Sequence, residues 1–210
     1  MMTDGVIDDY DKTNIGSPMP KFTFGWTNTF RYKNFDLSVF INGSYGNKVY
    51  NYLSMKLTHM NSPWTNQLNA VNGRAQLVPI NPNKVYEDGT MWYNDVSNVM
   101  VANPGASIPR ATINDPNDND RISDRYIEDG SYIRLKNISL GYTFPKKTID
   151  KLGLSNLRIY ANIQNLLTIT GYDGYDPEIG ASTSSVNVYG LDNGRYPSPT
   201  VYSFGLNVSF

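Results

Sequence analysis

The stretch "SYIRLKNISLGYTFP", residues 131–145, decides the fold. From Ile138 onward every second residue is apolar, and the residues between them are Ser139, Gly141 and Thr143. This alternation is typical of a β-strand with two chemically different faces. The small polar face does not suit burial in a soluble core, so the apolar face must meet something dry outside the sheet.

Four further segments alternate in the same way, so we expect an all-β fold with about five antiparallel strands. Each segment is roughly long enough to cross a bilayer at a tilt, which takes about 9–11 residues. Tyr and Phe recur near the segment ends, where membrane barrels carry girdles of aromatic residues. The predicted strands cover residues 21–32, 35–47, 131–144, 156–169 and 200–210.

The connections between the predicted strands differ greatly in length. Short, breaker-rich links follow the first and the third strand, whereas polar stretches of residues 49–130 and 170–199 follow the second and the fourth. Structureless loops of that length are improbable inside a compact soluble domain. Short turns on one side and long loops on the other are the layout of a transmembrane β-barrel, with the long loops outside the cell. We therefore predict that the apolar face meets lipid and the polar face lines a wet lumen.

Charged residues test this assignment of faces. Arg31 and Arg158 fall on the polar parity, where a charge stays hydrated. Tyr132, Arg134 and Lys136 share the apolar parity but precede the apolar run. We expect these three to form a strand extension that stands above the membrane in water.

Five strands cannot close a barrel, because even the smallest membrane barrels have about eight. The N-terminal residues MMTDGVIDDYD show no secretion signal. We therefore expect the chain to be the C-terminal part of a large transmembrane β-barrel, whose free edges pair with strands it lacks. The apolar face of the last strand would then be the C-terminal signal for barrel insertion. Its residues are Tyr202, Phe204, Leu206, Val208 and Phe210.

Composition excludes several functions. The net charge of -1 leaves no basic face for nucleic acid. The chain has no cysteine and one histidine, His59, so thiolate sites, His-based triads and multi-histidine metal sites are excluded. It has no run of about 18 apolar residues that could form a membrane helix. We expect no enzymatic activity.

Four blocks of the sequence resemble the SusC/RagA family of TonB-linked outer-membrane receptors. The most characteristic is "RISDRYIEDGSYIRLKNISLGYTFP" (Arg121–Pro145). The others are Leu157–Gly180, Tyr196–Phe210 and the upstream residues 4–51, so the resemblance covers almost the whole chain. The middle of the long loop, about 55–110, shows no such block.

The resemblance implies a 22-stranded barrel with an N-terminal plug and a TonB box, in the outer membrane of a Gram-negative bacterium. Such receptors import glycans or peptides, and a SusD-like surface lipoprotein caps the barrel mouth. The plug, the TonB box and most of the barrel are absent here. The TonB complex would act through that missing N-terminal part, and the fragment alone is not expected to transport anything.

Aromatic residues in the two long loops are candidates for contact with a ligand or a partner protein. Exposed rings can stack on sugar faces or anchor a protein, and they can equally pack the loops upon themselves. The candidates are Trp64, Trp92 and Tyr93 in the first loop and Tyr172, Tyr175 and Tyr189 in the second.

Two acidic stretches have some of the character of calcium sites. Thr3–Asp11 has the Gly and acidic spacing of the second half of an EF-hand loop, but the first ligands and the final Glu are missing. Asp4, Asp8 and Asp11 would be its ligands in the intact parent. Residues 114–124 carry further aspartates that also suit plain turns. We expect solvated acidic turns at both places, and no cofactor.

A soluble, secreted β-rich domain that binds or hydrolyses carbohydrate is the alternative hypothesis. It would account for the loop aromatics and the acidic stretches. Glycosidases need two carboxyl groups at a defined separation, and no pair is singled out by its spacing here. This hypothesis predicts that the apolar faces pack together in a water-soluble core.

Overall fold

The computed structural model describes residues 7–115, 118–178 and 189–210. The chain folds as two compact units. The larger comprises Asn14–Asn51 and Ile127–Phe210, and the smaller comprises Met1–Thr13 and Tyr52–Tyr126. Among the described residues, no helix has the length and apolar character needed to cross a membrane.

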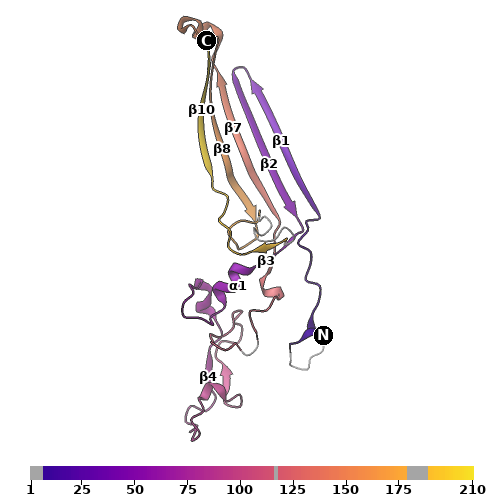
Figure 1. The fold of residues 1–210 in the computed structure, drawn as a ribbon, viewed down its shortest axis with the longest axis vertical. Helices are drawn as coiled ribbons and strands as arrows, with labels where there is room; N and C mark the ends of the chain where they lie inside the picture. Colours follow the sequence, from indigo (N-terminus) through magenta and orange to yellow (C-terminus); the bar gives the residue numbers. More distant parts are fainter. Residues whose placement is uncertain (1–6, 116–117, 179–188) are drawn as a thin grey trace. The chain divides into compact units, whose positions relative to one another are not determined.

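The larger unit is built around a five-stranded antiparallel sheet, whose long strands lie side by side in Figure 1. The all-β class with five antiparallel strands is therefore confirmed. Each strand begins and ends within two residues of its expected range. In spatial order the strands are β1 (Phe22–Tyr32), β2 (Phe35–Tyr45), β7 (Tyr132–Thr143), β8 (Asn156–Thr170) and β10 (Val201–Ser209).

The register of the sheet separates polar from apolar side chains across all five strands. Because side chains alternate between the faces of a strand, neighbouring rows of paired residues lie on opposite faces. One polar row is Thr29, Ser38, Ser139, Asn162 and Ser203. The adjacent apolar row is Phe30, Leu37, Leu140, Ala161 and Phe204.

A β-bulge at Lys136 corrects one prediction. In β7, Leu135 and Asn137 pair with consecutive residues of β2, so Lys136 is the extra residue. A bulge shifts the side-chain alternation by one residue. Residues before it therefore exchange faces: Leu135 joins the apolar face, and Arg134 joins the polar face opposite Thr168. The apolar parity predicted for Arg134 is therefore wrong, and its side chain is buried and not in water, with 3% exposed.

The connections have the expected asymmetry. β1 and β2 are joined by the two-residue turn of Lys33 and Asn34. β7 and β8 are joined by α2 (Lys146–Ile149) and the 3-10 helix η5 (Asp150–Leu152). At the opposite end the long connections of this unit form a small sheet in the order β6-β3-β9. Its strands are β3 (Lys48–Asn51), β6 (Ile127–Asp129) and β9 (Leu191–Asp192).

The smaller unit contains only short elements. The helix α1 (Tyr52–Thr58) buries Met55 and Thr58, and the strands β4 (Leu77–Pro79) and β5 (Val99–Val101) pair with each other. The remaining elements are the 3-10 helices η1 (Asp9–Asp11), η2 (Asn69–Gly73), η3 (Trp92–Asn94) and η4 (Asp124–Tyr126).

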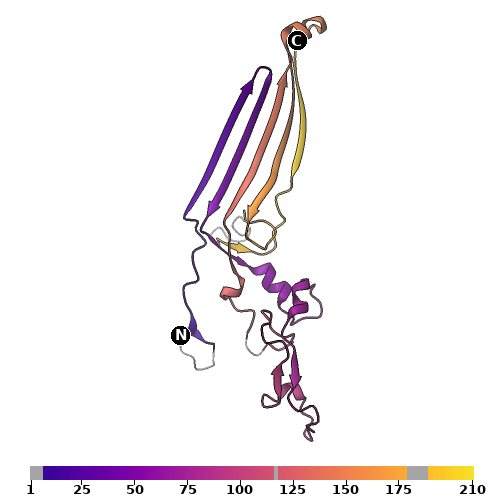
Figure 2. The same cartoon turned by 180° about the vertical axis from the view of Figure 1, so that it is seen from behind.

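The five-stranded sheet has two unpaired edges within the described residues. β1 pairs with β2 alone and β10 pairs with β8 alone, so the sheet does not close on itself (Figure 2). A long sheet edge offers a row of free N–H and C=O groups to another strand. Both edges are therefore open to further strands.

Candidate functional site

The polar face of the sheet carries a charge pair. Arg158 on β8 donates to Asp36 on β2 at 2.6 Å, with the two side chains 25% and 30% exposed. The ring of Tyr160 lies 5.1 Å from the Arg158 guanidinium carbon. Gly141 is on β7, the strand between β2 and β8, and a Cβ at this residue would overlap the Arg158 guanidinium. Arg31 pairs with Asp36 in the register, so both arginines predicted for the polar face lie on it.

The apolar face is exposed and carries aromatic pairs near both ends of its strands. Phe22 and Tyr45 have ring centroids 5.4 Å apart where β1 begins and β2 ends. Phe35 and Tyr142 have ring centroids 4.7 Å apart at the other end. The rings between them include Trp26, which is 56% exposed. A large apolar surface of this kind is an interaction surface for another protein layer or for lipid.

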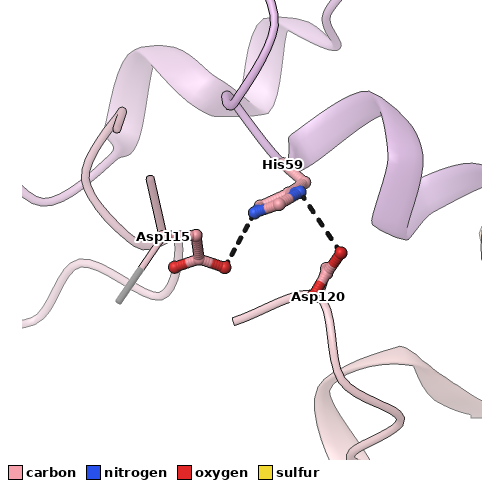
Figure 3. A group of neighbouring side chains, drawn as sticks. All are labelled: His59, Asp115 and Asp120. Atoms are coloured by element: carbon pink, nitrogen blue, oxygen red, sulfur yellow. Dashed lines mark hydrogen bonds and ion pairs between the residues drawn. The ribbon is translucent and has the colours of Figure 1, made fainter. Parts of the chain in front are cut away.

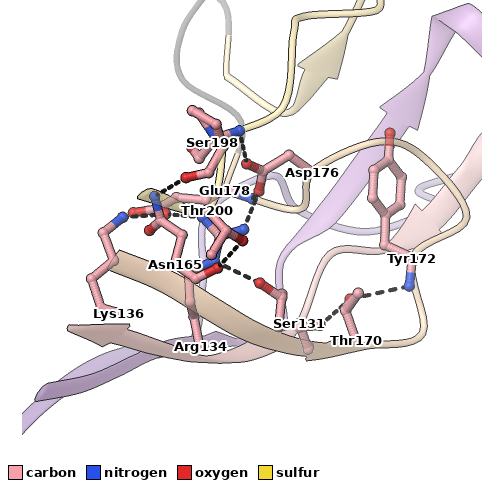
Figure 4. A network of polar contacts seen from close by, with 12 residues as sticks. Ser131, Arg134, Lys136, Asn165, Thr170, Tyr172, Asp176, Glu178, Ser198 and Thr200 are labelled. Carbon is pink, nitrogen blue, oxygen red and sulfur yellow. Dashed lines mark hydrogen bonds and ion pairs between the residues drawn. The ribbon is translucent and has the colours of Figure 1, made fainter. Parts of the chain in front are cut away.

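Arg134 is the centre of a polar network near the start of β7 (Figure 4). Its guanidinium donates to Thr168 Oγ1 at 2.8 Å, to Glu178 Oε2 at 2.6 Å, and to Asp176. Lys136 also donates to Glu178, at 2.5 Å. Each of the three guanidinium nitrogens therefore donates to an acceptor, and such bonds stabilise a buried arginine.

Asp176 ties together two parts of the connection between β8 and β10. Its carboxylate accepts from the backbone N–H of Glu178 at 2.9 Å and of Ser198 at 3.0 Å. Burial opposes ionisation, but the Arg134 guanidinium and these N–H groups outweigh it and lower the pKa of Asp176. Glu178 and Ser198, from two parts of the connection, are thus fixed near the start of β7.

The same connection is anchored at a second point. Tyr172 is buried and donates to Asp192 Oδ2 at 2.6 Å, and Asp192 also accepts from the N–H of Gly194. Glu128 accepts from Asn51 at 2.8 Å and from the N–H of Asp173 at 2.9 Å. These bonds hold the start of the connection on the small sheet of β3, β6 and β9.

The six candidate contact aromatics divide by exposure. Tyr172 differs from the others because its ring is buried, which gives it a structural role in its loop. Trp64 is the most exposed, at 92%. Trp92 packs edge-on against Tyr93, with centroids 5.7 Å apart. Tyr175 and Tyr189 are exposed.

The predicted acidic ligands near the N-terminus form a local turn. Asp4 lies outside the described residues. Asp8 caps η1 by accepting from the N–H of Tyr10 at 2.8 Å, and Asp11 accepts from the N–H of Asp8 at 3.2 Å. The expectation of a solvated acidic turn at this place stays a prediction.

A second acidic stretch meets the single histidine, as Figure 3 shows. His59 follows α1, and its Nε2 lies 2.9 Å from Asp115 Oδ2 while its Nδ1 lies 3.8 Å from Asp120 Oδ2. His59 and Asp115 are each 8% exposed. The sequence gives no sign of this contact, because 56 positions separate His59 from Asp115 and no local pattern links them.

The last strand presents its predicted insertion residues on the apolar face. Tyr202, Phe204 and Leu206 are 62%, 85% and 60% exposed. On the opposite face, Gly205 lies beneath the Tyr160 ring, and a Cβ there would overlap that ring. Val208 lies on the same face of the strand, and Phe210 directly follows the last strand residue, Ser209.

Comparisons with known proteins confirm the resemblance predicted from the sequence. No protein-family model matches the chain. It is 36% identical to TonB-dependent receptor P3 of Formosa agariphila over 211 residues, which cover 98% of this chain and 18% of that receptor. It is 29% identical to TonB-dependent receptor SusC of Bacteroides thetaiotaomicron over 209 residues, which cover 98% of this chain and 17% of SusC.

The solved structure of the RagAB peptide transporter has the same fold in the matched part. The TM-score is 0.67 at 21% identity, over 93% of this chain and 18% of the RagAB chain. The open five-stranded sheet is therefore part of a larger barrel of this kind. The chain spans less than a fifth of the length of the curated relatives it matches.

Proposed function

We propose that this chain forms part of the wall and mouth of a TonB-dependent transporter of the SusC/RagA kind in the outer membrane of a Gram-negative bacterium. The transporter would import glycans or peptides together with a SusD-like surface lipoprotein. The observation that carries the proposal is the separation of polar and apolar rows across all five strands. The likeness to SusC and to the RagAB peptide transporter supports it.

The apolar face suits contact with lipid. The five strands have 9 to 15 residues, and a strand tilted by about 45° needs about 9–11 to cross the hydrocarbon core. The aromatic pairs Phe22–Tyr45 and Phe35–Tyr142 lie where the two membrane interfaces would be. The charge pair of Asp36 and Arg158 would face the hydrated lumen, which avoids the cost of placing a charge in lipid.

The long connections suit the extracellular mouth. The bonds of Arg134 and Tyr172 fix the second connection to the end of the sheet, so its exposed rings are presented from a rigid base. Tyr175 and Tyr189 in this connection, and Trp64 in the first, are available to stack on sugars or to contact the lipoprotein. The role we propose for the chain is binding and passage, without catalysis. Energy would come from the TonB complex through the parent's N-terminal part.

Thiol labelling of the full-length protein on intact cells tests the topology. Val85→Cys in the first connection is 82% exposed, and Lys151→Cys lies in the exposed turn between β7 and β8. Cysteines elsewhere in the full-length protein are replaced by serine, since this chain has none. We expect a membrane-impermeant maleimide to label Val85→Cys on intact cells, and Lys151→Cys only after the outer membrane is opened. The reverse pattern, or a chain recovered in the soluble fraction, contradicts the proposal.

A further inference from the structure

A groove hollows the apolar face of the sheet toward the turn that joins β7 to β8. Ala161 pairs with Leu140 on one side and with Phe204 on the other, so a small side chain lies between two large ones. The groove at this place has a volume of about 530 Å³. Its walls include Leu140 and Tyr142 of β7, Ile159 of β8, and Phe204 and Leu206 of β10.

The lining of the groove requires an apolar occupant. The side chains of Leu140, Ile159 and Leu206 have no polar atom, and the backbone of β8 pairs with β7 on one side and with β10 on the other. An occupant with hydrogen-bonding groups would lose its water in this groove without gaining partners. A hydrocarbon chain therefore suits it.

Two aromatic rings lie at the end of the groove nearest the turn. Tyr142 lines the groove, and Phe144 packs edge-on against it with ring centroids 5.0 Å apart. Tyrosine is typical of the membrane interface, where its ring meets acyl chains and its hydroxyl meets headgroups and water. A hydrocarbon chain in the groove would therefore have its polar head on the side of the turn.

Three lysines gather in that turn. The helices α2 and η5 carry Lys146, Lys147 and Lys151, all of them exposed. In the part of the chain that the structure describes, none of the three forms an ion pair. α2 begins only three residues after Thr143, the last residue of β7. Long flexible lysine stems can carry their charges from such a turn to a nearby interface.

Acidic side chains do not balance these lysines. Asp150 is the one acidic residue in the connection between β7 and β8. Asp36 on β2, at the same end of the sheet, lies on the polar face and is paired with Arg158. An excess of positive charge therefore adjoins an apolar groove, and an anionic headgroup on an acyl chain is complementary to both.

We propose that the groove binds one acyl chain of an anionic phospholipid, whose phosphate is held by Lys146, Lys147 and Lys151. The lipid belongs to the leaflet on the side of the short turns. The inference rests on the proposed function, because only a wall that faces lipid presents the groove to acyl chains. A zwitterionic phospholipid fits less well, since its headgroup brings a positive charge that the lysines repel.

Quenching of a bimane label by spin-labelled lipids tests the proposal in the full-length protein. Val208→Cys carries the label on the apolar face of β10 and does not line the groove. The protein is reconstituted in phosphatidylcholine vesicles with a small, equal fraction of acyl-spin-labelled phosphatidylglycerol or phosphatidylcholine. We expect the anionic quencher to be at least about two-fold more effective than the zwitterionic one, because the lysines enrich it at this site.

Variants of the turn separate a specific site from general contact with lipid. Lys146→Gln, Lys147→Gln and Lys151→Gln together should make the two quenchers equal. The same three residues changed to arginine keep the charge and should preserve the difference. Equal quenching in the unaltered protein, or a difference that survives the three glutamines, overturns the proposal.

A second pair of variants tests the groove itself. Ala161→Phe fills it and should reduce the preference for the anionic lipid at least by half. Ile163→Phe, two positions away on the same face of β8, does not line the groove and should leave the preference unchanged. Equal effects of the two variants contradict binding in the groove. Failure of both lipids to quench has a different meaning, since it removes the lipid contact on which the proposed function also depends.

Discussion

Arg134 on β7 and Asp176 in the following connection form a buried ion pair, with side chains 3% and 9% exposed. The two residues are 42 positions apart. Because Asp176 also accepts backbone N–H groups from Glu178 and Ser198, this one pair fixes both ends of a loop to the sheet. The mouth of the proposed barrel therefore depends on the charge of Arg134. The apolar pattern of β7 gives no sign that this side chain is buried.

Replacing Arg134 with methionine should loosen the connection between β8 and β10. The substitution leaves Asp176 and Glu178 without their buried partner, and such a loss typically costs about 3–5 kcal/mol. We expect the local opening free energy of residues 171–178, measured by hydrogen exchange in the full-length protein, to fall by about 3 kcal/mol. Lys136→Met leaves the Arg134–Asp176 pair intact and should cost less than about 1 kcal/mol. Equal protection in all three proteins would show that the pair does not anchor the loop.

Acid should release the same connection. The pKa of Asp176 is lower in the folded chain than its ordinary value, so its stabilising effect is complete above that ordinary value and is lost as the pH falls through the folded value. An environment-sensitive dye on Tyr175→Cys should give a constant signal from pH 7 to about pH 4 and change below it. In the Asp176→Asn variant this acid transition should disappear. A transition near neutral pH that survives Asp176→Asn would assign the response to other groups.

The strands could be predicted from the sequence because their signal is local. In a strand with one face toward lipid and the other toward water, neighbouring residues meet different solvents. Apolar and polar residues then alternate along the sequence with a period of two. The alternation of Ser139 and Leu140 can be recognised without knowing which residues they pair with. The short turn at Lys33 and the long stretch after Tyr45 then give the layout of the connections.

The bulge and the loop contacts could not be predicted for the same reason. The extra residue Lys136 resembles any other strand residue, and only its pairing with β2 reveals the shift of faces. The burial of Arg134 requires Asp176, and the setting of His59 requires Asp115. Contacts between residues 42 and 56 positions apart leave no periodic trace in one sequence.

Substituting Gly205 with valine should destabilise the pairing of β8 and β10. A Cβ at Gly205 would overlap the ring of Tyr160, and overpacking of this kind typically costs about 1–3 kcal/mol. We expect the full-length protein to unfold at a lower urea concentration, measured as the loss of its folded, heat-modifiable form. Tyr160→Ala combined with Gly205→Val removes the overlap and should recover part of the loss. Additive losses in the double variant would contradict the contact.

An arginine should be tolerated on one face of β7 and rejected on the other. Leu140→Arg places the charge on the apolar face, two residues from Tyr142. A charge facing lipid costs about 2–4 kcal/mol at the middle of the bilayer and less toward the interfaces. Ser139→Arg places it one residue away on the polar face. We expect Leu140→Arg to lower the amount of folded protein in the outer membrane several-fold, while Ser139→Arg remains close to the unaltered level. Similar losses for both variants would mean that the two faces do not differ in solvent.

Spin labels at these two neighbouring positions test the assignment of faces most directly. Leu140→Cys and Ser139→Cys are labelled separately in the full-length protein in lipid vesicles, and relaxation by oxygen, which concentrates in lipid, is compared with relaxation by a water-soluble nickel chelate. We predict that oxygen dominates at residue 140 and the nickel chelate at residue 139. Nickel access that is equal at both positions, or burial of both labels from either reagent, would contradict a sheet that stands between lipid and a wet lumen.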